Sequence, residues 1–259
     1  MLLAIDVGNT NMVFAIYRGK ELVGSFRLMT DENRTSDEIG LTIYNYFQLS
    51  GLKMTDVEDV IIASVAPQVM YTLTSAMVRY FGRKPIVIDD DVDPGLLYNG
   101  EDRLGADRSV ACVAAIEKYG APLVVLDFGT ATTVDAVEPG YRYLGGCITT
   151  GLRVVADALV KKAALLTKVE LALPPDVVSL STTGQIQAGI VGGYVGAIEY
   201  LVRRTKQEMP NGDKARVVAT GGLVRLISDN SDVIDIVDGQ LIMDGLRIIY
   251  ERYKQSSGN

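Results

Sequence analysis

Short apolar runs alternate with longer segments of helical periodicity along most of the chain. Runs of four to six apolar residues are typical of buried strands, and apolar positions three to four residues apart indicate amphipathic helices. This alternation predicts an α/β architecture. The predicted strands lie at 2–5, 12–17, 60–64, 85–88, 123–126, 134–137 and 217–219, and the predicted helices at 37–50, 69–81, 106–119, 152–162, 184–207 and 243–253.

One pattern, an apolar strand followed by Asp, a glycine and small polar residues, occurs twice. Asp6 and Asp127 open the two turns and lie 121 positions apart (127 − 6). The same offset aligns Leu2 with Leu123, Gly8 with Gly129, Val13 with Val134 and Ala15 with Ala136. An internal repeat predicts a duplicated unit. We therefore expect two lobes, residues 1–115 and 116–259, that face each other across a central cleft.

Three further expectations concern glycines and the last helix. Residues 145–151, rich in glycine, are expected to form a loop, and residues 172–183 a second loop. In the helix at 184–207, Gly189 and Gly193, and Gly192 and Gly196, are four residues apart and permit close contact with another helix. The helix at 243–253 is expected to pack on the second lobe.

Composition excludes several kinds of chemistry. The chain has no histidine, so neither a Ser-His-Asp system nor histidine-ligated zinc is possible. Its formal net charge of −7 disfavours nucleic acid as a partner. The two cysteines, Cys112 and Cys147, indicate reduced thiols in a cytoplasm, Cys112 in the core and Cys147 in the glycine loop. No apolar run reaches the length of a membrane span, and the first residues do not resemble a signal peptide.

The turn at Asp6–Asn11 has the composition of a phosphate-binding loop. Glycine allows close approach of the backbone, and successive N–H groups with Asn and Thr side chains can surround phosphate oxygens. Asp6, at the end of the strand, is suited to hold hydrated Mg²⁺. The alternative interpretation of this turn alone is an ordinary hairpin turn with an Asp side-chain bond.

Two more turns follow apolar strands in the second half. Asp127–Thr133 offers three threonines and a glycine, and a carboxylate at the end of such an apolar strand needs a cation or donors to compensate its charge. Gly221 and Gly222, after the strand at 217–219, permit flat approach to a ring such as adenine. For these glycines a plain tight turn is an equally good explanation.

Gly105–Arg108 opens the helix at 106–119. A helix N-terminus favours anions, Arg108 is suited to bind a carboxylate or a moving phosphate, and Asp107 to orient a hydroxyl. Taken alone, the segment is better explained by Asp107 as an N-cap and Arg108 as a surface residue. No P-loop or Rossmann glycine motif is present.

Together these motifs resemble the type III pantothenate kinases, a family of the actin-like (ribonuclease H-like) fold. The resemblance extends from Met1 to about Tyr253 and rests on DVGNTN at Asp6–Asn11, GADR at Gly105–Arg108, DFGTATT at Asp127–Thr133, Gly145-Gly146 and Thr220–Gly222, with support from 34–38 and 62–65. It implies ATP-dependent phosphorylation of pantothenate at its terminal hydroxyl to 4'-phosphopantothenate, the first step toward coenzyme A.

The resemblance also implies site residues. ATP with Mg²⁺ is expected at Asp6, Val7, Gly8, Asn9, Thr10, Asn11 and Thr130. Pantothenate is expected at Tyr98, Gly105, Ala106, Asp107 and Arg108, with Asp107 as the catalytic proton acceptor. Asp127 is expected to bind a monovalent cation, K⁺ or NH₄⁺. Thr182 is expected to reach the substrate from the neighbouring subunit of a homodimer, with the helix from Gly184 as the dimer contact or as a contact within one chain.

The chain departs from the family pattern at two places. Thr149-Thr150-Gly151 stands where a Pro-Gly loop is usual, and Ser181 where Asn is usual. Both departures concern the substrate pocket and not the phosphate-binding turns. Two alternatives to pantothenate kinase are another actin-like phosphotransferase, acting on a sugar, an acetate-like acid or a polyphosphate, and a non-catalytic regulatory protein. Retention of both Asp6 and Asp127 with their glycines favours an enzyme.

Overall fold

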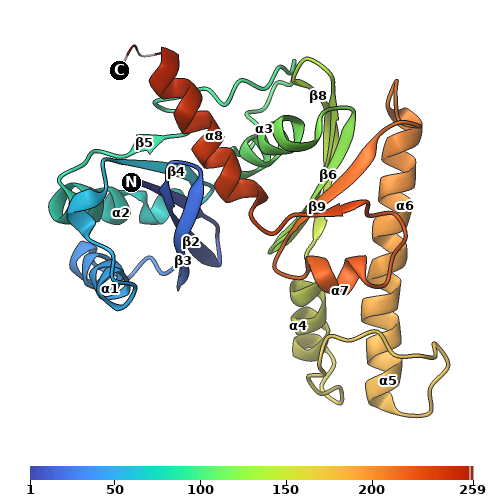
Figure 1. The fold of residues 1–259 in the computed structure, drawn as a ribbon. Helices are drawn as coiled ribbons and strands as arrows, with labels where there is room; N and C mark the ends of the chain where they lie inside the picture. The colour runs from blue at the N-terminus through green and yellow to red at the C-terminus, as the bar shows by residue number, and fades with distance from the viewer. Residues whose placement is uncertain (257, 259) are drawn as a thin grey trace. The chain divides into compact units, whose positions relative to one another are not determined.

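The computed structural model describes residues 1–256 and 258, and the chain forms two compact units. Unit 1 comprises Met1–Ala114 and the segment that begins at Leu241, and unit 2 comprises Ala115–Gln240. Each unit contains a five-stranded sheet with helices packed against it (Figure 1). The predicted α/β architecture with two duplicated lobes is therefore confirmed.

The sheet of unit 1 has the strand order β3-β2-β1-β4-β5. β1 is antiparallel to β2 and parallel to β4. On β1, Leu3, Ile5 and Val7 face one buried cluster, because side chains alternate between the two faces of a strand. The strands are β1 (Leu2–Val7), β2 (Asn11–Arg18), β3 (Glu21–Met29), β4 (Asp59–Ser64) and β5 (Ile86–Val87).

Helices α1 (Ser36–Leu49) and α2 (Pro67–Phe81) cover that face of the sheet, and a short 3₁₀ turn, η1 (Met54–Asp56), precedes β4. The start of α1 is fixed by a capping box: Thr35 accepts the N–H of Glu38, and the Glu38 carboxylate accepts the N–H of Thr35 at 2.7 Å. α2 ends at Gly82, which has a positive φ of 65°.

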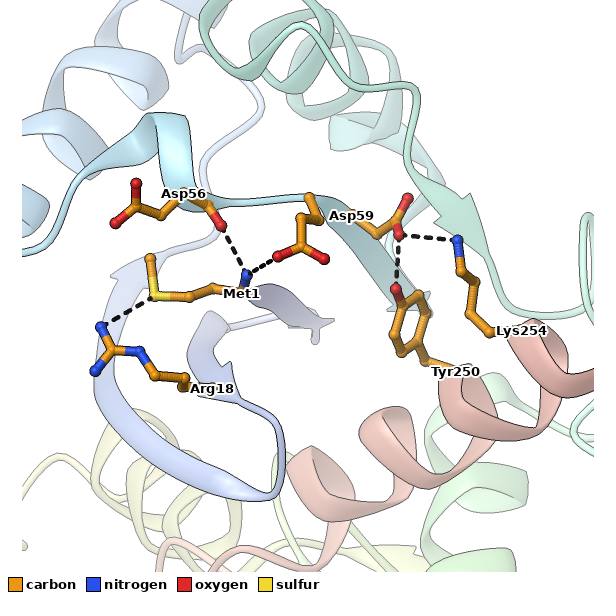
Figure 2. Close-up of polar contacts among 7 residues, drawn as sticks. Met1, Arg18, Asp56, Asp59, Tyr250 and Lys254 are labelled. Carbon is orange, nitrogen blue, oxygen red and sulfur yellow. Dashed lines mark hydrogen bonds and ion pairs between the residues drawn. The ribbon is translucent and has the colours of Figure 1, made fainter. Parts of the chain in front are cut away.

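The last helix, α8 (Leu241–Ser256), packs against β1 and β4 and belongs to unit 1. The expectation that it packs on the second lobe is wrong. Its apolar residues are spaced for burial on one face, but the sequence does not say which sheet offers the matching face. Figure 2 shows the polar contacts that hold it: the Asp59 carboxylate on β4 accepts from the Tyr250 hydroxyl at 2.6 Å and from the Lys254 ammonium at 3.3 Å.

The same region of unit 1 anchors the first residue. The Met1 ammonium donates to the Asp56 carbonyl at 2.7 Å and to Glu58 at 2.9 Å (Figure 2).

Burial, and then the bond to Asp59, raise the pKa of Tyr250 above its usual range. The Tyr250 phenol therefore stays protonated and keeps its bond to Asp59 at neutral pH.

Helix α3 (Ala106–Tyr119) crosses α8 at Gly245, which is buried. A Cβ at Gly245 would lie 2.7 Å from the Val110 carbonyl oxygen and 3.0 Å from the Ala114 side chain. We expect Gly245→Ala to lower the free energy of unfolding by about 1–3 kcal/mol, as overpacking of a core does. Urea unfolding measures the change. Gly239→Ala, where a Cβ meets open space, is the control, and equal stability of the two variants would contradict the prediction.

The sheet of unit 2 has the order β10-β9-β6-β7-β8. β6 is antiparallel to β7 and parallel to β9, as β1 is to β2 and β4. The predicted loop at 145–151 is instead largely strand β8, which places Cys147 on a strand. The strands are β6 (Leu123–Phe128), β7 (Ala131–Glu138), β8 (Arg142–Thr150), β9 (Arg216–Gly221) and β10 (Ile236–Val237). The last strand predicted from the sequence was the one at 217–219, but β10 follows it.

The helices of unit 2 bury a second cluster against β6, β7 and β9. The predicted helix at 184–207 is composite: α5 and α6 are joined by a π turn, η2. Gly189, Gly193 and Gly196 on this helix face open space within the chain. The elements are α4 (Leu152–Lys162), α5 (Thr182–Gln187), η2 (Ala188–Gly192), α6 (Gly193–Glu208) and α7 (Val224–Ser228).

The two copies of the repeat differ by one residue in their turns. Three residues, Gly8 to Thr10, separate β1 from β2, whereas two, Gly129 and Thr130, separate β6 from β7. β2 therefore corresponds to β7 at an offset of 120 (131 − 11), and the burial patterns of the two strands match at that offset in all but the last position. The predicted alignment of Leu2 and Gly8 with Leu123 and Gly129 holds, but that of Val13 with Val134 is wrong by one residue, as is that of Ala15 with Ala136.

Candidate active site

The turn after β1 is tightly held from the end of β3. The Gly8 N–H donates to the Asn11 carbonyl at 3.0 Å, and the Thr30 hydroxyl donates to the Gly8 carbonyl at 2.7 Å. The Thr30 N–H donates to the Thr10 carbonyl at 3.0 Å. Asn9, Thr10 and Asn11 are exposed at the tip. Thr30 was not singled out from the sequence, although it lies one residue beyond β3 and so within reach of this turn.

The predicted substrate segment lies in the first turn of α3. This helix begins at Ala106, and the Ser109 N–H donates to the Gly105 carbonyl, so Gly105 and not Asp107 occupies the N-cap position. The alternative interpretation of Asp107 as an N-cap is therefore wrong. The Asp107 Oδ1 atom accepts the Arg108 N–H at 2.7 Å, and a Cβ at Gly105 would lie only 2.8 Å from that oxygen.

Tyr98 is brought to the same place. Its hydroxyl accepts the N–H of Leu104 at 3.1 Å, the residue before Gly105. Asp107 and Arg108 are half-buried, as is Tyr98. Unit 1 thus gathers the predicted substrate residues at one helix N-terminus, where the main-chain N–H groups and helix dipole favour an anion.

In unit 2, two motifs treated separately in the sequence meet at adjacent strand ends. β6 and β9 are parallel, with Asp127 opposite Thr220 and Phe128 opposite Gly221. Gly221 has a φ of 101°, and a Cβ there would lie 2.6 Å from the Phe128 N and O atoms and 2.7 Å from the Asp127 Oδ1. The Gly222 N–H donates to the Phe128 carbonyl at 3.2 Å. Only glycine fits between these strand ends, where the Asp127 carboxylate lies over its Cα.

The turn at Gly129-Thr130 is held by a third segment. The Gly151 N–H donates to the Thr130 carbonyl at 3.0 Å, and a Cβ at Gly151 would collide with the carbonyl oxygens of Gly129 and Thr130. Gly151 therefore supports the turn, whereas the sequence suggested it only as the end of the glycine-rich segment 145–151 and as part of the departure at Thr149-Thr150-Gly151. It begins α4 as its N-cap residue.

Thr182 lies elsewhere in unit 2. It is the exposed first residue of α5, after Ser181, whose hydroxyl accepts the Gly184 N–H at 3.1 Å. Thr182 lines an apolar cavity of about 600 Å³ between α4, α5, η2 and α6, not the ends of β6 and β9. The structure of one chain does not bring Thr182 to the predicted phosphate turn of this unit.

Asp6 and Asp127 each offer a single half-buried carboxylate at a strand end. Within residues 1–256 and 258, no three His, Cys, Asp or Glu side chains are grouped as a metal site. One carboxylate with main-chain and hydroxyl oxygens fits hydrated Mg²⁺ on phosphate, because Mg²⁺ keeps several waters.

In that same part of the chain, no helix combines the length and apolar character needed to cross a membrane.

The fold and the paired turns define a protein of the actin-like kinase and ATPase class. The family model for type III pantothenate kinases matches residues 2–204, and the chain belongs to that family. The matched part contains both Asp-Gly turns and the Gly105–Arg108 segment, whereas Gly221 and Gly222 lie outside it.

Solved structures share this fold at low sequence identity. A Campylobacter jejuni protein described as a Baf family transcriptional activator has a TM-score of 0.64 and 20% identity over 98% of this chain and 99% of its own. A Sinorhizobium meliloti protein described as a 2-dehydro-3-deoxygalactonokinase has a TM-score of 0.64 and 13% identity over 97% and 96%. The activator of a 2-hydroxyisocaproyl-CoA dehydratase from Clostridium difficile, with bound ADPNP, has a TM-score of 0.52 and 14% identity over 99% and 97%. These similarities concern the fold alone.

Proposed function

We propose that this protein phosphorylates pantothenate with ATP to give 4'-phosphopantothenate, the first step of coenzyme A biosynthesis. Membership of the type III pantothenate kinase family supports this activity. The observation that carries it is the placement of the half-buried Asp107 carboxylate over Gly105, beside the loop that Tyr98 closes. This arrangement offers a carboxylate for a hydroxyl and a helix N-terminus for the substrate's own carboxylate.

We assign ATP binding to the turns at Asp6–Asn11 and Gly129-Thr130 and to Gly221-Gly222. Their glycines leave room for phosphate and ring atoms beside the main chain, and the exposed Asn9, Thr10 and Thr130 supply donors. The bound ADPNP of the dehydratase activator is a nucleotide on the same fold and supports this assignment. Asp6 would hold Mg²⁺ through water, and that ion would neutralise charge on the phosphates.

In the transfer, the substrate hydroxyl oxygen forms a bond to the γ-phosphorus as the bond from that phosphorus to the ADP oxygen breaks. The hydroxyl proton passes to the Asp107 carboxylate. Because such transfers have a loose transition state, Asp107 mainly orients the hydroxyl and takes the proton late. Arg108 is suited to bind the pantothenate carboxylate by a charge-assisted contact.

The direct test is ATP-dependent phosphorylation of pantothenate by the purified protein with Mg²⁺. Formation of 4'-phosphopantothenate, detected by mass spectrometry, is the expected result. A panel of sugars, sugar acids and acetate serves as control acceptors. Turnover of another acceptor in preference to pantothenate would overturn the assignment of pantothenate as the substrate, but the assignment as a kinase would stand. No turnover of any acceptor would favour a regulatory role.

We propose that Asp127 binds K⁺ or NH₄⁺ beside the nucleotide. Its carboxylate against Gly221 is the charge that such a cation would neutralise, and ATP brings more negative charge to the site. We expect replacement of K⁺ by Na⁺ to lower kcat/KM by roughly tenfold or more, equivalent to about 1.4 kcal/mol. Asp127→Asn should remove the difference between the two salts. Equal rates of the unmodified protein in K⁺ and Na⁺ would refute the cation site.

We propose a homodimer formed by α5, η2 and α6, with Thr182 reaching the partner's substrate. The described chain leaves space around Gly189, Gly193 and Gly196, so contact within one chain does not explain these glycines. Gly193→Glu is expected to convert a dimer to a monomer in size-exclusion chromatography with light scattering. Gln207→Glu adds the same charge to an exposed position of α6 and should leave the dimer intact. A dimer that survives Gly193→Glu would place the interface elsewhere.

A further inference from the structure

Tyr194, in the first turn of α6, makes a buried hydrogen bond to the strand that follows the second phosphate turn. Its hydroxyl lies 2.5 Å from the Thr132 Oγ1. Thr132 has no exposed surface, and Tyr194 is 8% exposed. Leu152, the first residue of α4, belongs to the same buried cluster as Tyr194. Neither Tyr194 nor Thr132 has a role in the phosphoryl transfer proposed above.

The bond to Thr132 connects Tyr194 to the strand that leaves the turn at Gly129-Thr130. Thr132 is two residues beyond Thr130 on β7. Leu152 follows Gly151, whose N–H holds the Thr130 carbonyl at 3.0 Å. The phenol hydroxyl therefore fixes the strand that leaves the turn, while the Gly151 N–H holds the turn from the start of α4. Burial raises the pKa of the Tyr194 phenol, so the hydroxyl keeps its proton throughout the neutral range.

Tyr194 belongs to the buried cluster of unit 2 and also borders a cavity. The residue lines the apolar cavity of about 600 Å³ in unit 2, so part of its side chain meets no protein atoms. The π turn η2 ends at Gly192, two residues earlier. A π turn adds one residue to the helix and so rotates the residues after it, and such turns are frequent at functional sites. The orientation of the Tyr194 side chain toward Thr132 depends on this inserted residue.

We propose that Tyr194 is a positioning residue that holds the Gly129-Thr130 turn in the conformation that binds ATP phosphates. This inference rests on the proposed ATP site but not on the identity of the acceptor. Loss of the hydroxyl leaves the turn and its main-chain bonds in place but lets them shift. Because one net hydrogen bond is worth about 0.5–1.5 kcal/mol, the affinity for ATP is expected to fall by about two- to tenfold.

The test measures the Kd of a non-hydrolysable ATP analogue by calorimetry, and the KM values for ATP and pantothenate. Tyr194→Phe is expected to raise the Kd and the KM for ATP two- to tenfold while the KM for pantothenate stays unchanged. Thr132→Val should do the same, Thr132→Ser should retain the affinity, and the double variant with Tyr194→Phe should be no weaker than either single variant.

Tyr143→Phe is the matched control, because it removes a hydroxyl bonded at 2.8 Å to the buried Asp135 in the same sheet, four residues beyond Ala131. It is expected to change stability only. An unchanged Kd for Tyr194→Phe, or an equal rise for Tyr143→Phe, would overturn the positioning role. An unmodified protein that binds no nucleotide would instead refute the proposed function.

Discussion

Asp107→Asn is expected to lower kcat by roughly 10²–10⁴-fold, the usual contribution of a positioned general base. The amide has nearly the shape of the carboxylate and can still accept the Arg108 N–H through its oxygen, so the first turn of α3 is preserved. What is lost is the capacity to take the hydroxyl proton. The Kd of the ATP analogue and the melting temperature should change little, which separates a chemical defect from a folding defect.

The control for Asp107→Asn is Asp102→Asn, which removes an exposed carboxylate from the loop just before Gly105. It should retain the activity of the unmodified protein. Steady-state assays with pantothenate at saturating ATP compare the two variants. If Asp107→Asn kept nearly full activity, the proton acceptor would have to be sought elsewhere, although the kinase assignment would stand.

Gly221→Ala is expected to disrupt the nucleotide half-site of unit 2. A Cβ at this position would lie 2.6 Å from Phe128 main-chain atoms and 2.7 Å from the Asp127 carboxylate, and the φ of 101° is unfavourable for alanine. Either β9 moves away from β6 or Asp127 is displaced. We expect a loss of about 1–3 kcal/mol in stability and at least a tenfold loss of ATP affinity.

The next residue supplies the control for Gly221→Ala. A Cβ at Gly222 meets nothing within 4 Å and its φ is ordinary, so Gly222→Ala should unfold at the same urea concentration as the unmodified protein. The effect of Gly222→Ala on the affinity for ATP reports only whether the added methyl group touches the bound nucleotide. Equal urea midpoints for Gly221→Ala and Gly222→Ala would show that the strand ends are looser than the structure indicates.

The sequence predicted the architecture and the main motifs because these depend on local patterns. The apolar strand, aspartate and glycine of each turn lie within a few residues, and the helices at 106–119 and 152–162 have the predicted bounds. The motifs are also in the order of the family. These local signals were sufficient to predict two duplicated lobes.

What the sequence did not predict depends on contacts between distant segments. The meeting of Asp127 with Gly221 follows from the pairing of β6 with β9, which are far apart in the chain. The roles of Thr30 and Gly151 come from the strands that return to the turns, and β8 was mistaken for a loop because its glycines masked the alternation of a strand. The one-residue difference between the turns was hidden because alanine and valine recur at neighbouring positions.

The return of α8 to unit 1 has a consequence for synthesis on the ribosome. The sheet of unit 1 is made early, but the helix that covers the β1 and β4 face emerges only after the whole of unit 2. Unit 2 is continuous in the chain and can therefore complete its fold first, although its synthesis begins later. Until α8 arrives, apolar surface on the nascent unit 1 is uncovered, and exposed apolar surface of this kind favours aggregation.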